Sequence, residues 1–172
     1  MPKKTLKTNW DLSVLYKSGN DPKIEQDLLK FESACRKFER KYKNSQLFLR
    51  NSKVLLTALI QYENIYGMVE GPRPLAYFFF SRDLNSTDQY VEAMMNKISA
   101  RLTKSYNCLI FFTLSLGKMS LKLQEKSLKD RSLRHFRYFL SQIFLSAKHD
   151  LSLSEVYGAM KCGQGNQKPN IP

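Results

Sequence analysis

The chain is poor in histidine, with two in 172 residues, His135 and His149. Neither belongs to His-Glu-x-x-His, the pattern that places two zinc ligands and a glutamate base on one helix face. His149 precedes Asp150 and could act as a general base oriented by a carboxylate. The simpler interpretation is a helix C-terminus, where the helix dipole favours a partly charged imidazole. We interpret His135 as a surface helix residue and predict no catalytic or metal-binding residue.

Cysteine is scarce as well. Cys35, Cys108 and Cys162 are odd in number and far apart in the sequence, which favours reduced structural thiols over a disulfide framework or a Cys-x-x-Cys metal site. A phosphate-binding loop is also missing, because the sequence GQG at 163–165 lacks a third glycine and a preceding strand. We therefore predict no cofactor-binding residue.

Long hydrophobic runs are absent. The longest, Cys108–Leu116 (CLIFFTLSL), is about half of the roughly 20 residues that span a bilayer. The lysines near the N-terminus, Lys3, Lys4 and Lys7, are not followed by the apolar stretch and cleavage site of a secretory signal. We expect no transmembrane helix and a cytoplasmic location.

Negative charge is in deficit: 28 Lys and Arg face 15 Asp and Glu, for a net charge of +13. Such an excess attracts nucleic acid, acidic proteins and anionic lipid non-specifically. The cations within 30–43 and 118–137 lie mainly off the apolar stripes, and no nucleic-acid-binding signature is present. Solvated basic faces are the simplest interpretation, and we expect no specific nucleic acid and no membrane as partner. A small basic helical module that binds nucleic acid or an acidic protein remains the alternative function.

Helical periodicity is what the sequence does contain. Asp21-Pro22 has the form of a helix cap followed by proline at the first helical position, and predicts a helix over 21–43. A second helix is predicted over 52–66. The predicted apolar stripe of the first helix consists of Ile24, Leu28, Phe31, Cys35, Phe38 and Tyr42.

Later segments repeat this pattern. Ser86 and Gln89 form a capping box, which predicts a helix from there to Gly117. Residues 132–148 carry another apolar stripe. A second capping box at Ser152 and Glu155 marks a helix start near 153, but no apolar period follows Glu155, so we predict that this helix is not continued. Four consecutive aromatics, Tyr77–Phe80, fit either a buried strand or a helix apolar on nearly all sides.

Together these patterns predict an all-α, multi-helix array. The length of the chain predicts one main folding unit. We expect an extended segment at 1–20, a helical lobe at 21–155 and a disordered tail at 156–172, where the apolar period is lost and glycine and proline accumulate.

Four segments in this order resemble the N-terminal part of the oligoendopeptidase F family, which belongs with the thimet-oligopeptidase-like zinc metallopeptidases. They span about residues 8–155 and agree in order and spacing. The matching segments are Trp10–Tyr16 (WDLSVLY), Pro74–Gln89 (PLAYFFFSRDLNSTDQ), Asn107–Lys118 (NCLIFFTLSLGK) and Leu133–Ser152 (LRHFRYFLSQIFLSAKHDLS).

The resemblance implies a helical lobe that helps to wall a cavity for short peptides, and it favours a helix for Tyr77–Phe80. In that family the zinc ligands, two histidines of His-Glu-x-x-His and a later glutamate, lie in the C-terminal half. None of those positions exists here, so no catalytic, zinc-binding or cofactor residue is carried over. We expect the isolated chain to be inactive, with a separately encoded catalytic part as one conceivable partner. After Glu155 the sequence departs from the family, which favours truncation or a frameshift over a short protein with a new terminus.

Overall fold

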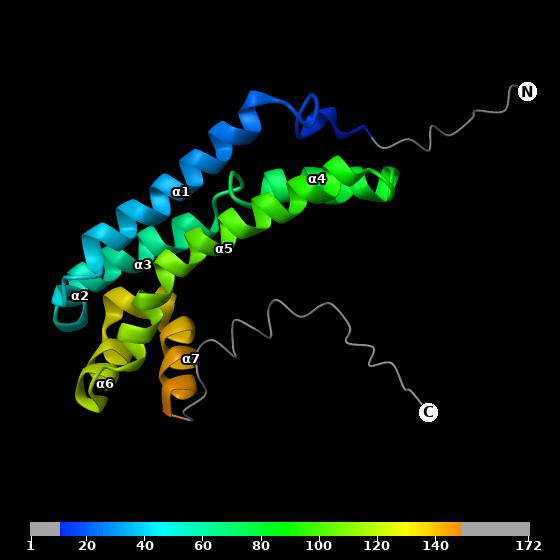
Figure 1. The fold of residues 1–172 in the computed structure, drawn as a ribbon. Helices are drawn as coiled ribbons and strands as arrows, with labels where there is room; N and C mark the ends of the chain where they lie inside the picture. The colour runs from blue at the N-terminus through cyan, green and yellow to red at the C-terminus, as the bar shows by residue number, and fades with distance from the viewer. Residues whose placement is uncertain (1–10, 149–172) are drawn as a thin grey trace, which may run out of the picture. The chain divides into compact units, whose positions relative to one another are not determined.

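The computed structural model describes residues 11–148 and shows an all-α protein, as predicted (Figure 1). This range forms seven α-helices and two short 3-10 helices, and contains no β-strand. None of the described helices combines the length and the apolar character that a membrane span requires. The elements in chain order are η1 (Leu12–Val14), α1 (Pro22–Tyr42), α2 (Leu47–Arg50), α3 (Ser52–Tyr66), α4 (Pro72–Leu84), α5 (Gln89–Gly117), α6 (Leu121–Lys129), η2 (Arg131–Phe136) and α7 (Arg137–Lys148).

The described chain divides into two compact units. Its length alone predicted one main folding unit. Unit 1 comprises 11–45 and 58–110, and unit 2 comprises 46–57 and 111–148. The helices α3 and α5 each run from one unit into the other. A length estimate cannot detect such a division, because the two units share helices instead of being separated by a linker.

The first predicted helix, α1, is confirmed. The Asp21 carboxylate accepts a hydrogen bond from the backbone N–H of Lys23 at 2.9 Å, and Pro22 follows at the first position of the helix. This cap satisfies a donor that has no partner inside the helix. All six residues of the predicted apolar stripe are buried: Ile24, Leu28, Phe31, Cys35, Phe38 and Tyr42.

The helix α3 is confirmed over the predicted range, and α5 ends at Gly117 as predicted. The cap of α5 is corrected. The helix begins at Gln89, and the carboxylate of Asp88 accepts hydrogen bonds from the N–H groups of Tyr90 and Val91 at 3.0 and 3.3 Å. Ser86 therefore lies outside the helix, because a nearer carboxylate fills the capping position.

The four aromatics Tyr77–Phe80 lie in a helix, α4, which decides between the two structures that the sequence allowed. Only Phe78 among them is fully buried, and Phe79 keeps 44% of its surface exposed. In unit 1 the helix α4 contacts both η1 and α1. The segment is thus a surface helix with one buried side.

In unit 2, α6, η2 and α7 pack on one another. The stripe predicted over 132–148 is confirmed, although its first turn is 3-10 rather than α-helical. The short helix α6 was not predicted. The buried side chains of unit 2 include Leu133, Phe136, Leu140, Ile143 and Phe144 from η2 and α7.

Several sequence predictions lie outside the described residues. They are the helix start near 153 that the sequence does not continue, the tail at 156–172, and the roles assigned to His149, Cys162 and GQG at 163–165.

Candidate functional site

The nucleophilic and basic side chains of the described range do not form a catalytic set. His135 is exposed on η2, with its ring edge-on to Phe136 at 4.8 Å between centroids. Burial raises the pKa of the Cys35 thiol to about 12, and burial also raises the pKa of Cys108. Thiols with such pKa values stay protonated and weakly nucleophilic at neutral pH. Their environment agrees with the structural role predicted for both cysteines.

No group of three or more His, Cys, Asp or Glu side chains within 11–148 is placed to hold a metal ion. A structural or catalytic zinc needs three or four such ligands converging on one point. The part of the chain that the structure describes therefore offers no assembled metal site.

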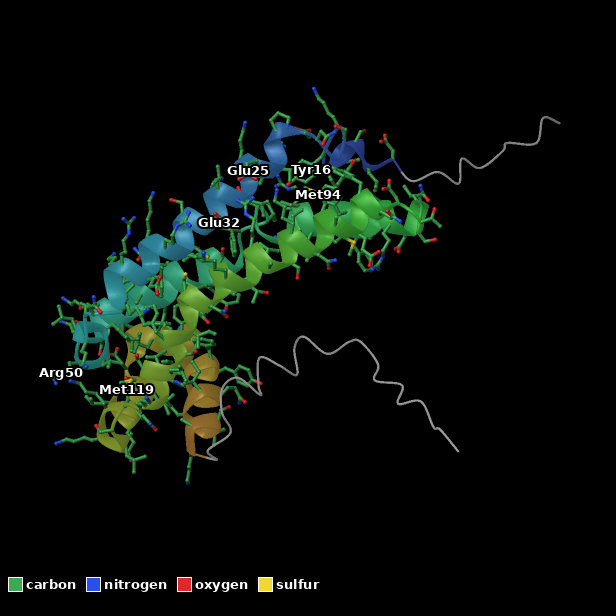
Figure 2. All side chains as sticks on the ribbon, in the orientation of Figure 1. Tyr16, Glu25, Glu32, Arg50, Met94 and Met119 are labelled. Atoms are coloured by element: carbon green, nitrogen blue, oxygen red, sulfur yellow. The ribbon has the colours of Figure 1, made fainter. Side chains whose placement is uncertain are left out.

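A pocket of about 300 Å³ lies in unit 1 between the start of α1 and α5. Glu25 lines it from α1 and Met94 from α5 (Figure 2). In its lining the hydroxyl of Tyr90 donates to Asn20 Oδ1 at 2.8 Å and lies 3.2 Å from the carbonyl oxygen of Gly19. We call this recess the Arg101 pocket, because the Arg101 guanidinium forms part of its wall.

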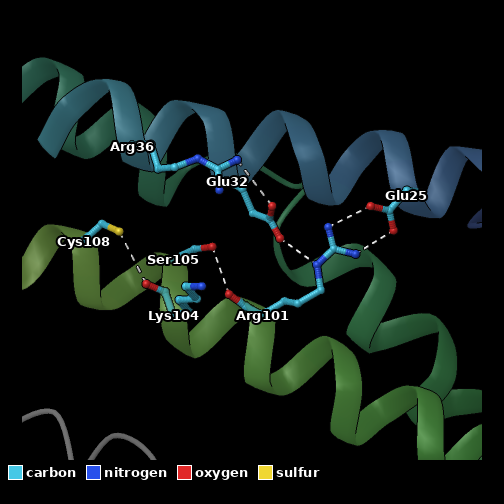
Figure 3. A network of polar contacts seen from close by, with 7 residues as sticks. All are labelled: Glu25, Glu32, Arg36, Arg101, Lys104, Ser105 and Cys108. Carbon is cyan, nitrogen blue, oxygen red and sulfur yellow. Dashed lines mark hydrogen bonds and ion pairs between the residues drawn. The ribbon is translucent and has the colours of Figure 1, made fainter. Parts of the chain in front are cut away.

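The Arg101 guanidinium joins α5 to two turns of α1 (Figure 3). Its Nη1 and Nη2 atoms donate to the two carboxylate oxygens of Glu25 at 2.6 and 2.9 Å, and its Nε donates to Glu32 at 2.7 Å. Arg36 lies 3.5 Å from the other oxygen of Glu32. The two-pronged contact with Glu25 is the strong, directional form of the Arg–carboxylate interaction.

The contact between Arg101 and Glu25 favours the charged form of both groups. Hydrogen bonds from Arg101 lower the pKa of Glu25, and hydrogen bonds to Glu25 and Glu32 raise the pKa of Arg101. A general acid or base needs a pKa near the working pH, and these shifts move both groups away from neutrality. The arrangement is therefore suited to holding α1 against α5, and not to proton transfer.

A second polar cluster of unit 1 joins the buried side chains of Tyr16 and Asp27 to the half-buried Arg73. The hydroxyl of Tyr16 donates to Asp27 Oδ2 at 2.7 Å, and Nη1 of Arg73 donates to the same oxygen at 3.0 Å. Burial, followed by the contact with Asp27, raises the pKa of Tyr16. The cluster ties the segment before α1 to α1 and α4, and its side chains are engaged with one another.

A third feature is a recess of about 400 Å³ between α1 and α3, which we call the α1–α3 groove. Lys37 and Lys41 line it from α1. The amides of Gln61 and Asn64 line it from α3. The rest of the lining is apolar and comprises Ala34, Phe38, Ile65 and Met68.

The sequence indicated none of the cross-helix pairs. Glu25 and Glu32 are seven residues apart and so share one side of α1, which is the only local sign of a common partner. Nothing in the sequence names Arg101 as that partner, because pairing between helices depends on tertiary packing. The predicted basic face of α1 is exposed, but three of its cations, Lys30, Arg36 and Lys43, pair with glutamates.

The described residues form an all-α protein. Its two polar clusters, around Arg101 and around Asp27, hold helices together. No family model matches this chain, and no curated protein or solved structure matches it either.

Proposed function

We propose that this chain is the N-terminal helical lobe of an oligoendopeptidase F-like zinc peptidase and is inactive as an isolated chain. The observation that carries the proposal is the resemblance of four separate segments in one order. The helical structure supports it, since Pro74–Gln89 falls mainly in α4, Asn107–Lys118 in α5, and the described part of Leu133–Ser152 in η2 and α7. A helical lobe requires helices at these positions.

In such an enzyme this lobe would bind and position peptide, while the chemistry would come from elsewhere in the protein. When bound by its own ligands, zinc polarises the scissile carbonyl and activates water. The described residues would contribute cavity wall. Arg101 and Arg73 would hold the helices that form this wall in place, through Glu25, Glu32 and Asp27.

The first test is to read the coding DNA beyond codon 172 in all three frames. We expect His-Glu-x-x-His and a later glutamate, in the same or a shifted frame. Their absence from every frame would contradict the peptidase proposal.

Inactivity of the isolated chain has a separate test. The purified 172-residue protein is incubated with zinc and a quenched fluorescent peptide, with and without a chelator. We expect no cleavage in either sample. Cleavage that the chelator abolishes would show that the chain holds its own catalytic site.

A separately encoded catalytic part would need a surface on which to dock. Tyr138 and Leu145 lie seven residues apart on α7 and keep 76% and 52% of their surfaces exposed, so that they share one helix side. If a partner covers this side, the isolated chain should bind a hydrophobic dye and self-associate in gel filtration. A monodisperse monomer that binds no dye would count against this version.

The second candidate function is a small basic helical module that binds nucleic acid or an acidic protein. The α1–α3 groove favours it, because the groove presents two lysines and no carboxylate. Phosphate contacts make affinity fall steeply as salt rises. If the protein is retained on an anionic resin at low salt only, the attraction is non-specific. This result would contradict the second candidate function.

A further inference from the structure

The charge on α1 is distributed unevenly. Lys30 and Arg36 of α1, and Lys43 at its C-cap, each pair with a glutamate whose carboxylate compensates their charge. Lys41 instead donates to the neutral amide oxygen of Gln61 at 3.3 Å, and Lys37 has no hydrogen-bond or ion-pair partner among residues 11–148. The α1–α3 groove thus carries two positive charges that no lining carboxylate compensates.

The lining of the groove suits a peptide. Side-chain amides both donate and accept hydrogen bonds, as the peptide bond does. The Gln61 oxygen already accepts from Lys41 and from the hydroxyl of Tyr42 at 2.9 Å, which leaves its NH₂ group to donate. Met68 adds an adaptable apolar side chain to the lining, and methionine accommodates varied partners.

The same lining disfavours nucleic acid. Binding of single strands uses aromatic rings whose faces are open for base stacking. The aromatic ring of this groove belongs to Phe38, which is 3% exposed and packs against Tyr42 and Tyr62. A ring buried to this extent has no open face for a base, so the groove offers charge without a stacking platform.

We propose that the α1–α3 groove binds an acidic protein segment, with two carboxylates on Lys37 and Lys41 and an apolar side chain against the apolar lining residues. Lys37 and Lys41 are one helical turn apart, about 6 Å along the axis. Alternate residues of an extended peptide are spaced by about 6.6 Å and point to one side. The segment recognised is therefore of the type Glu-x-Glu-x-Leu. This inference rests on the second candidate function and is independent of the peptidase proposal.

The test is a fluorescence anisotropy titration with the labelled peptide Glu-Ser-Glu-Ser-Leu at about 0.15 M salt, where exposed charges are screened beyond about 8 Å. The matched peptide Gln-Ser-Gln-Ser-Leu should bind more weakly, and so should Glu-Ser-Glu-Ser-Ser. Replacing Lys37 by glutamine should weaken binding of the acidic peptide by about fivefold, the upper range for an exposed charge pair.

The control variant is Lys23→Gln, which removes the same charge from an exposed position of α1 outside the groove. Its affinity should stay within about twofold of the unaltered protein, because exposed charges interact weakly at a distance. Circular dichroism checks that both variants keep their helices. Equal binding of the acidic and neutral peptides, or equal losses for Lys37→Gln and Lys23→Gln, would overturn the proposal. Stronger binding of a short single-stranded DNA would overturn it as well, in favour of nucleic acid.

Discussion

The two units of this protein are stabilised in different ways. In unit 1, ion pairs join helices that are far apart in the sequence, as Arg101 does with Glu25 and Arg73 with Asp27. In unit 2, apolar packing dominates, as in the contact of Phe48 with Phe112 and the close approach of Gly117 to Ala147. An ion pair of unit 2, Lys129–Glu125, links residues one turn apart on an exposed surface.

This difference separates two sources of specificity. Directional polar contacts determine which side of one helix faces another, because a guanidinium must meet its carboxylate in a set geometry. Apolar packing is less directional and depends on filling volume. Unit 1 should therefore respond to lost charges and to acid, and unit 2 mainly to lost volume.

The largest effect is expected in unit 2, from Phe112→Ala. Phe112 is 0% exposed and its ring lies 5.1 Å from that of Phe48. Deleting the ring should lower the free energy of unfolding by about 3–5 kcal/mol, measured by urea denaturation, because a cavity remains in a packed core. Hydrogen exchange should rise first in 46–57 and 111–148. The control Tyr138→Ala, at a site 76% exposed, should change stability by no more than about 0.5 kcal/mol. Similar losses for both variants would contradict the assigned core.

In unit 1 the largest polar effect is expected from Arg73→Met. The Asp27 carboxylate, whose side chain is 10% exposed, would keep only the hydroxyl of Tyr16. A buried charge without its partner should cost about 2–3 kcal/mol of unfolding free energy. The matched variant Lys30→Met removes a pair whose lysine is 64% exposed, and should cost less than about 1 kcal/mol. If the two variants lose equal unfolding free energy in urea denaturation, the buried and the exposed ion pair contribute equally to stability, which would contradict this prediction.

A smaller effect is expected from Gly71→Ala. A Cβ atom at this position would lie 2.9 Å from Cδ2 of Phe31, a ring that is fully buried. The ring has little room to move, so overpacking should cost about 1–3 kcal/mol. Gly67→Ala is the control, because its nearest new contact is an ordinary 3.5 Å. A thermal melt that shows no difference between the two variants would contradict the close approach.

Much of the helical structure was predictable, because apolar side chains at spacings of three and four mark the buried side of a helix. The stripe of α1 and the continuation of α5 to Gly117 follow from that rule. The helix α6 escaped it, since Leu121 is 74% exposed and Ser127 is buried with its hydroxyl on the carbonyl oxygen of Leu123. A helix whose buried side includes a polar residue has no clear apolar period.

The polar clusters were not predictable for a different reason. Arg101, Glu25 and Asp27 are ordinary surface residues by composition, and their roles arise only when helices far apart in sequence meet. The α1–α3 groove has the same origin: Lys37 and Lys41 belong to the predicted basic face of α1, but Gln61 and Asn64 come from α3. Local patterns identify helices and not their neighbours.

The smallest expected effect is a loss of stability in acid. It tests whether ion pairs contribute to the stability of unit 1. The pKa of Glu25 is lowered from its usual 4.5 by hydrogen bonds from Arg101. A carboxyl with a lowered pKa in the folded state stabilises the fold above its unfolded pKa, and this stabilisation is lost as pH falls through the folded pKa. The melting temperature should therefore fall as pH drops below about 4.5. The contribution is below about 1 kcal/mol, because the Glu25 side chain is 55% exposed and screened by solvent.

Arg101→Met should flatten this pH dependence, because the pKa of Glu25 then returns toward its usual value. Other carboxyls with lowered pKa values, Glu39 and Glu70 among them, still titrate in both proteins. The informative quantity is therefore the difference between the two profiles. Lys104→Met, which removes an exposed charge from the same helix, should keep the full acid sensitivity. Parallel profiles for Arg101→Met and the unaltered protein would mean that the Arg101 network does not make unit 1 sensitive to acid.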